Sequence, residues 1–201
     1  MGRQNPAGIE IAAGVTTLTP DEVMAGARAP GGPVVIFDDD HYYMGASMAE
    51  KLCLDAADVT YVTPATEVAS WTHNTLEQHR IQARLLQIGV RVVTAHNLAR
   101  VAPGEALLDC IYSGARSTLA CAALVPVTMR RPVDSLYHAL LARGLDNITR
   151  IGDCHAPGTI AAAVHDGHRF ARAAGETEGE GVPFRRELVA LAGRGRRQEG
   201  P

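Results

Sequence analysis

Pro33-Val34-Val35-Ile36-Phe37 is a continuous apolar run, which is typical of a β-strand buried on both faces of a sheet. A helix is predicted after it, over residues 44–54, and a second strand over residues 58–63, where Pro64 ends it. The order strand, helix, strand is the opening unit of a doubly wound sheet. The sequence therefore predicts an α/β, Rossmann-like core.

The pattern continues on both sides of this unit. Upstream, Thr19-Pro20-Asp21-Glu22 has the residues of a capping box and predicts the start of a short helix. Downstream, the spacing of apolar residues and the positions of glycine and proline predict two more helices and three more strands. The predicted helices cover residues 74–88 and 133–142, and the predicted strands cover residues 90–94, 107–112 and 119–128.

The turn after the first strand lacks the glycines of a dinucleotide-binding loop. It reads Asp38-Asp39-Asp40-His41-Tyr42-Tyr43-Met44-Gly45, where G-x-G-x-x-G would let backbone N–H groups approach a pyrophosphate. Carboxylates repel a pyrophosphate, and the tyrosine rings would occupy its volume. The core is therefore not expected to bind NAD(P) in the usual way. A magnesium site is the alternative use of the three aspartates, but a solvated acidic loop is favoured because consecutive turn residues seldom point to one centre.

A second nucleotide-related pattern lies near the end of the chain, at Ile151-Gly152-Asp153. A strand over residues 147–151 is predicted to stop there, and Pro157-Gly158 to open an alanine-rich helix. Asp153 can accept hydrogen bonds from a sugar or ribityl hydroxyl, and the free N–H groups that begin near Gly158 favour partial negative charge. The predicted cofactor-binding residues are Gly152, Asp153, Pro157, Gly158, Thr159 and Ile160.

Other candidate sites have simpler explanations. His73 could act in catalysis, but the favoured interpretation is that Thr72 or Asn74 caps the helix that follows. His165 and His168 could bind a metal with Cys154 or His155, but exposure to solvent or to a partner is favoured. The four cysteines, Cys53, Cys110, Cys121 and Cys154, form no C-x-x-C pair, so this chain alone is not expected to hold an iron–sulfur cluster or a structural zinc.

Composition favours neither nucleic acid nor a membrane as a partner. The 201 residues carry a net charge of −3, and 46% of them are hydrophobic. The longest apolar run, residues 119–129, is about half of the ~20 residues that span a bilayer. The first residues lack the apolar core of a signal peptide, so a cytoplasmic location is expected.

Several co-linear motifs resemble the C-terminal part of the family of trimethylamine dehydrogenase and dimethylamine dehydrogenase, which also includes the 2,4-dienoyl-CoA reductases. The resemblance spans roughly residues 18–188. It is carried by residues 18–24, 34–44 with 49–52, 73–77, 151–153, 167–169 and 183–187.

This resemblance implies an organisation and a role. Members of the family join a TIM barrel with FMN and a 4Fe–4S cluster to an FAD- or ADP-binding domain, into which an NAD-like domain is inserted. The chain resembles the inserted domain and a closing segment. The fold that this resemblance implies is a degenerate, NAD(P)-binding-like three-layer domain, followed by a segment that completes an FAD- or ADP-binding domain. The implied divisions are residues 1–32, an N-terminal crossover segment; 33–144, the Rossmann-like domain; 145–190, the closing segment; and 191–201, a disordered tail.

The function expected from the resemblance is that of a small, noncatalytic subunit of a flavin and iron–sulfur oxidoreductase. The enzyme would be an amine dehydrogenase or an oxidative N-demethylase of methylated amines or betaines. A larger TIM-barrel partner would supply FMN and the 4Fe–4S cluster, and FAD or ADP would bind between the two chains. The alternatives are a stand-alone degenerate Rossmann sensor or scaffold, and an NAD(P)H-dependent reductase subunit. A stand-alone module predicts a closed surface around residues 145–188, whereas a subunit predicts an exposed apolar face on the helix that contains residues 161–164.

Overall fold

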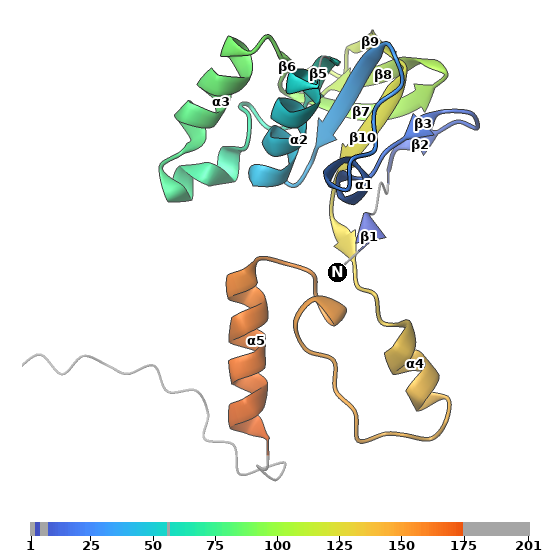
Figure 1. The fold of residues 1–201 in the computed structure, drawn as a ribbon, viewed down its shortest axis with the longest axis vertical. Helices are drawn as coiled ribbons and strands as arrows, with labels where there is room; N and C mark the ends of the chain where they lie inside the picture. Colours follow the sequence, from blue (N-terminus) through green and yellow to red (C-terminus); the bar gives the residue numbers. More distant parts are fainter. Residues whose placement is uncertain (1–2, 5–7, 56, 175–201) are drawn as a thin grey trace, which may run out of the picture.

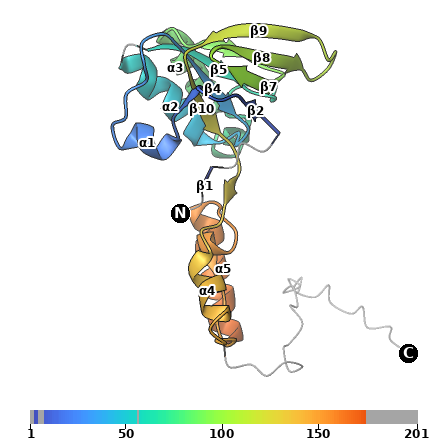
Figure 2. The same ribbon diagram turned by 90° about the vertical axis from the view of Figure 1, so that its right-hand side faces the viewer.

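The computed structural model describes residues 3–4, 8–55 and 57–174. Helices and stacked β-sheets form a body, and an arm projects away from it (Figures 1 and 2). Here the arm means residues 132–174.

The centre of the body is a five-stranded parallel sheet with the strand order β3-β10-β4-β5-β6. In β4 the side chains of Val34 and Ile36 pack into one core cluster, whereas those of Val35 and Phe37 pack into another. This alternation follows from the two-residue period of a strand and confirms the prediction of a strand buried on both faces. The strands are β3 (Thr16–Thr17), β10 (Ala123–Val127), β4 (Pro33–Asp38), β5 (Asp58–Val62) and β6 (Arg91–Val93).

Helices α1 (Pro20–Met24), α2 (Tyr43–Leu54) and α3 (Gln78–Gln87) cover one face of this sheet. The helix predicted over residues 44–54 is confirmed by α2. The helix predicted over residues 74–88 starts later, because residues Ser70–Thr75 form the short helix η1 and Leu76 then takes a left-handed φ of 62°. Neither Thr72 nor Asn74 caps α3, so that prediction is wrong.

A second sheet covers the opposite face, with the strand order β2-β7-β8-β9. The prediction of an α/β core with a parallel sheet is confirmed, but the prediction of a doubly wound sheet is wrong on this face, where a β-meander takes the place of helices. Leu98 and Leu108 of the meander belong to the same core cluster as Val35 and Val62. The strand predicted over residues 119–128 divides at Ala122, where the chain passes from this sheet to the parallel one. The body thus has three layers: helices, a parallel sheet and a mixed sheet. The strands are β2 (Glu10–Ile11), β7 (His96–Ala102), β8 (Gly104–Cys110) and β9 (Arg116–Cys121).

The capping box predicted at Thr19 forms at the start of α1. Thr19 Oγ1 accepts the Glu22 N–H at 3.2 Å, and the Thr19 N–H donates to Glu22 Oε2 at 2.7 Å. We predict that Thr19→Ala lowers the free energy of unfolding by about 1 kcal/mol, because the Glu22 N–H loses its acceptor and Glu22 Oε2 loses the Thr19 hydroxyl as a donor. Urea denaturation measures this loss. Thr19→Ser keeps the accepting oxygen and should retain most of the stability; an equal loss in both variants would contradict the capping role.

The arm begins beyond a short two-stranded pair. Strand β1 (Arg3–Gln4) lies antiparallel to β11 (Arg130–Arg131), and the arm then carries α4 (Ser135–Leu141), η2 (Gly152–Cys154) and α5 (Ile160–Ala173). No residue from 129 to 174 is buried.

The strand predicted over residues 147–151 does not form. A strand needs a neighbour with which to exchange backbone hydrogen bonds, and among the described residues none lies beside this segment. The helix predicted to open at Gly158 begins at Ile160, with Thr159 as its N-cap.

The predicted tail, residues 191–201, and the family-like motif at 183–187 lie outside the described residues. In the part of the chain that the structure describes, no helix combines the length and hydropathy needed to cross a bilayer.

Candidate functional site

The edge at which β4, β5 and β6 end is the place where parallel α/β sheets bind their ligands. Among the described residues, four that are not glycine have a positive φ, and all four lie in the segments that follow these strands. Non-glycine residues in this conformation are strained and are frequent at functional sites. They are His41 (61°), Ala69 (48°), Leu76 (62°) and Ala95 (55°).

The acidic turn places its first carboxylate inside the protein. Asp38 is completely buried, whereas Asp39 is exposed. Asp38 Oδ1 accepts the N–H groups of Asp40 and His41, each at 3.1 Å, and Oδ2 accepts a hydrogen bond from the hydroxyl of Tyr61. The prediction of a solvated acidic loop is therefore wrong for Asp38, because an adjacent strand supplies a partner that local sequence does not reveal.

Burial raises the pKa of Asp38 from 3.8 to about 6, although the hydrogen bonds from Tyr61, His41 and Asp40 act in the opposite direction. Burial also raises the pKa of Tyr61, and the nearby Asp38 carboxylate adds to the effect. Tyr61 stays protonated and donates to Asp38. Both oxygens of Asp38 therefore accept hydrogen bonds from the protein itself, from Asp40, His41 and Tyr61.

Gly45, in the first turn of α2, allows the helix to pass close to this carboxylate. A Cβ at position 45 would lie 2.6 Å from Asp38 Cγ and 2.7 Å from Asp38 Oδ2. Sequence reasoning missed both Gly45 and Tyr61. Their only signals were a glycine in the predicted helix and a tyrosine in an otherwise aliphatic strand.

The other titratable candidates do not join the acidic turn in a common centre. His73 is exposed, and its Nε2 lies 2.5 Å from Glu67 Oε1. His165 and His168 are exposed on α5. Within residues 3–4, 8–55 and 57–174, no three His, Cys, Asp or Glu side chains are grouped so that they could hold a metal ion.

The cysteines differ in environment. Cys121 is buried, and burial raises its pKa. Cys110 is half-buried at the end of β8, and hydrogen bonds from the Ser113 hydroxyl and from the N–H groups of Ser113 and Tyr112 lower its pKa to about 7. The spacing of the cysteines did not indicate these hydrogen bonds, which depend on the conformation of the residues after β8.

The six predicted cofactor-binding residues lie together on the arm, in η2 and at the start of α5, rather than at the edge of the body. The Gly152 N–H donates to Asp166 Oδ2 at 2.8 Å, and the Gly158 N–H donates to Asp153 Oδ1 at 3.3 Å. Thr159 Oγ1 accepts the Ala162 N–H at 3.3 Å, and the Ile160 side chain is 85% exposed. Pro157 lies in the loop between them.

These groups suit one side of a nucleotide site. Asp153 is a carboxylate that can accept from a ribityl or ribose hydroxyl, and α5 presents its N-terminus beside it. A pyrophosphate needs backbone donors from a glycine-rich loop, and among the described residues no such loop adjoins the arm.

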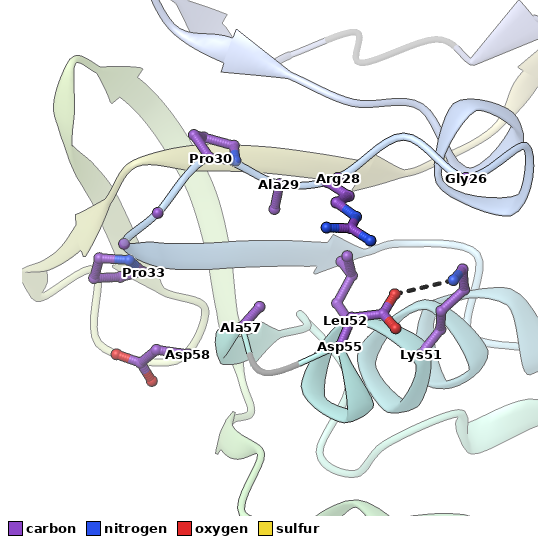
Figure 3. Close-up of a pocket in the computed structure, with 12 residues that line it drawn as sticks. Gly26, Arg28, Ala29, Pro30, Pro33, Lys51, Leu52, Asp55, Ala57 and Asp58 are labelled. Atoms are coloured by element: carbon purple, nitrogen blue, oxygen red, sulfur yellow. Dashed lines mark hydrogen bonds and ion pairs between the residues drawn. The ribbon is translucent and has the colours of Figure 1, made fainter.

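A cavity of about 720 Å³ lies at the opposite, amino-terminal edge of β4. Figure 3 shows it between the segment around Arg28 and Pro30 and the last turn of α2, where Lys51 pairs with Asp55 at 3.0 Å. Cationic and anionic side chains line it together, so its charge favours no ligand class. None of the predicted cofactor-binding residues lines it.

Comparisons with known proteins place this chain in a family. Residues 18–130 match the family described as OYE-like second alpha/beta domain. The chain belongs to this family. It is also 32% identical, over 199 residues, to dimethylamine dehydrogenase of Hyphomicrobium sp. (strain x), a match that covers 86% of this chain and 27% of that protein. The family relationship expected from the sequence is thereby confirmed.

Two solved structures extend this similarity. Histamine dehydrogenase from Rhizobium sp. 4-9 has 38% identity and a TM-score of 0.84 over 95% of this chain and 31% of its own. The 6-hydroxypseudooxynicotine amine oxidase from Pseudomonas geniculata N1 has 34% identity and a TM-score of 0.78 over 88% of this chain and 27% of its own.

This member of the OYE-like second-domain family is thus related to flavoenzymes of the amine dehydrogenase type, and it spans about a third or less of the length of each of these relatives. The match to histamine dehydrogenase covers 95% of this chain, so the unmatched part is much smaller than the arm, residues 132–174. The similarity therefore extends from the body into the arm.

Proposed function

We propose that this chain is a small, noncatalytic subunit of a cytoplasmic flavin and iron–sulfur oxidoreductase that oxidises amines or removes N-methyl groups from methylated amines or betaines. A larger TIM-barrel partner carries FMN and the 4Fe–4S cluster, and electron transfer takes place there. The arm completes a site for FAD or ADP that both chains share. No catalytic residue is assigned to this chain.

The observation that carries the proposal is an arm without a core. Neither α4 nor α5 contains a buried residue. The contacts within the arm are largely polar: Asp134 pairs with Arg150 and, at 3.1 Å, with His138, and Gly152 bonds to Asp166. Helices of about 12–15 residues are marginally stable in water without tertiary packing, and α5 has 14 residues. A second surface that covers α5 would supply the missing packing.

The exposed side of α5 has the composition of a docking face. Ile160 and Val164 are one turn apart, and 85% and 54% of their surfaces are exposed. His165, Arg169 and Arg172 lie on the other side of the helix. An exposed apolar stripe is what a subunit that docks on a partner would have. A stand-alone sensor would instead have a closed surface around residues 145–188, so the stripe favours the subunit. An NAD(P)H-dependent reductase subunit is disfavoured by the buried Asp38 at the dinucleotide turn.

Co-expression with a TIM-barrel flavin chain encoded beside this one tests the proposal. We predict that the two copurify, and that absorbance and mass analysis of the complex detect FMN, the cluster, and FAD or ADP. Ile160→Asp and Val164→Asp should each weaken the complex about tenfold or more, because each places a charge in a dry interface.

Ala161→Asp and His165→Asp are the matched controls, since they add the same side chain to the polar side of α5. They should copurify like the unmodified chain. A chain that remains alone after co-expression would contradict the proposal, and equal losses in all four variants would contradict the docking face.

A further inference from the structure

Asp38 is placed where a dinucleotide-binding domain begins its phosphate loop. It is the last residue of β4, and the next residues lead directly into α2. In a dinucleotide fold, the backbone N–H groups of this turn point at the ligand's phosphate. Here the N–H groups of Asp40 and His41 both point at Asp38 Oδ1, at 3.1 Å.

The carboxylate is held from two further directions. The Tyr61 hydroxyl from β5 donates to Oδ2, and α2 passes so close that only a glycine fits at position 45. Gly45 therefore leaves room for the Asp38 side chain. In a dinucleotide fold, the loop glycines leave room for the ligand in the same way. No part of Asp38 is exposed to solvent.

We propose that the Asp38 carboxylate is a built-in anion that occupies the backbone donors of the former phosphate turn and closes this end of the domain to nucleotides. The two backbone donors of the turn need an acceptor, and the chain supplies one itself. The inference concerns this chain alone and does not depend on a partner.

Chemical rescue tests this inference. Asp38→Ala removes one carbon and two oxygens, which formate can replace. At pH 8, we predict that this variant melts about 5–10 °C below the unmodified chain. Formate at about 100 mM should restore at least half of this loss, measured against sodium chloride of equal ionic strength.

Asp39→Ala, the control in the same turn, changes an exposed carboxylate and should show no formate effect. Should Asp38→Ala fail to fold in buffer, the yield of folded protein after refolding with and without formate gives the same readout. Formate effects that are equal in Asp38→Ala, Asp39→Ala and the unmodified chain would overturn the inference, as would the absence of any rescue.

The link to phosphate is tested with Asp38→Gly, which also vacates the Cβ position. Inorganic phosphate at about 20 mM should raise the melting temperature of Asp38→Gly and leave that of the unmodified chain unchanged. Equal responses would show that the freed N–H groups do not accept a phosphate, and would also overturn the inference.

Discussion

Gly45→Ala is expected to lower the free energy of unfolding by about 2–3 kcal/mol. Its new methyl group would meet three atoms of Asp38, at 2.6–2.8 Å. Asp38 cannot turn away, because both of its oxygens are bonded inside the core. In an open helical position the same substitution would stabilise the chain by about 1 kcal/mol, so the sign of the effect is itself diagnostic. Chemical denaturation provides the measurement.

A double-mutant cycle assigns this loss to Asp38. Asp38→Gly removes all three contacting atoms, so Gly45→Ala should cost nothing further in that background. Asp38→Ala retains the Cβ at 2.8 Å and should relieve only part of the strain. Gly167→Ala is the helical control, since no atom lies within 4 Å of its added Cβ. Additive losses at positions 38 and 45 would contradict the close contact.

The second large effect expected is a change of stability with pH. The pKa of Asp38 rises from 3.8 to about 6 on folding, so the folded state binds the proton more tightly. The stability that this group contributes is fully present below about pH 3.8 and is lost as the pH rises through about 6. At 1.36 kcal/mol per pKa unit, the loss is about 3 kcal/mol.

Asp38→Asn isolates this effect, because asparagine keeps the shape of the side chain and does not titrate. The stability of the unmodified chain relative to Asp38→Asn should fall by about 2.5 kcal/mol between pH 4 and pH 7.5, because a small part of the loss has already occurred at pH 4. The titratable groups that face Asp38 are Tyr61 on β5 and, in the turn itself, His41 and Asp40. They remain in both proteins. A difference that stays constant with pH would show that Asp38 keeps its ordinary pKa.

Local patterns in the sequence predicted the elements whose causes are local. The apolar run 33–37 became a buried strand, and the side chains of Thr19 and Glu22 formed their capping box. The predictions that failed concern segments whose structure depends on residues far away in the sequence. Residues 147–151 look like a strand but have no pairing neighbour in the part of the chain that the structure describes, and the run 119–128 changes sheets at Ala122.

In the candidate site, too, features with local causes were predicted and features that depend on distant residues were not. The position of the degenerate turn followed from its lack of glycines. The burial of Asp38 did not, because it depends on Tyr61, 23 residues further along the chain. Residues 152–160 lie together because they are neighbours in sequence, but their place on an arm without a core was not predicted. Nothing in the local pattern indicated that Asp153 would bond to Gly158 within the same loop.

The arm also has a consequence for the life of the chain in the cell. Proteases cleave segments whose backbone opens easily, and residues 129–174 have no buried side chain to hold them closed. If the chain works with a partner, as proposed, chains produced in excess of that partner would be degraded first, whereas assembled chains would be protected. Turnover, rather than synthesis alone, would then keep the amounts of the two subunits matched.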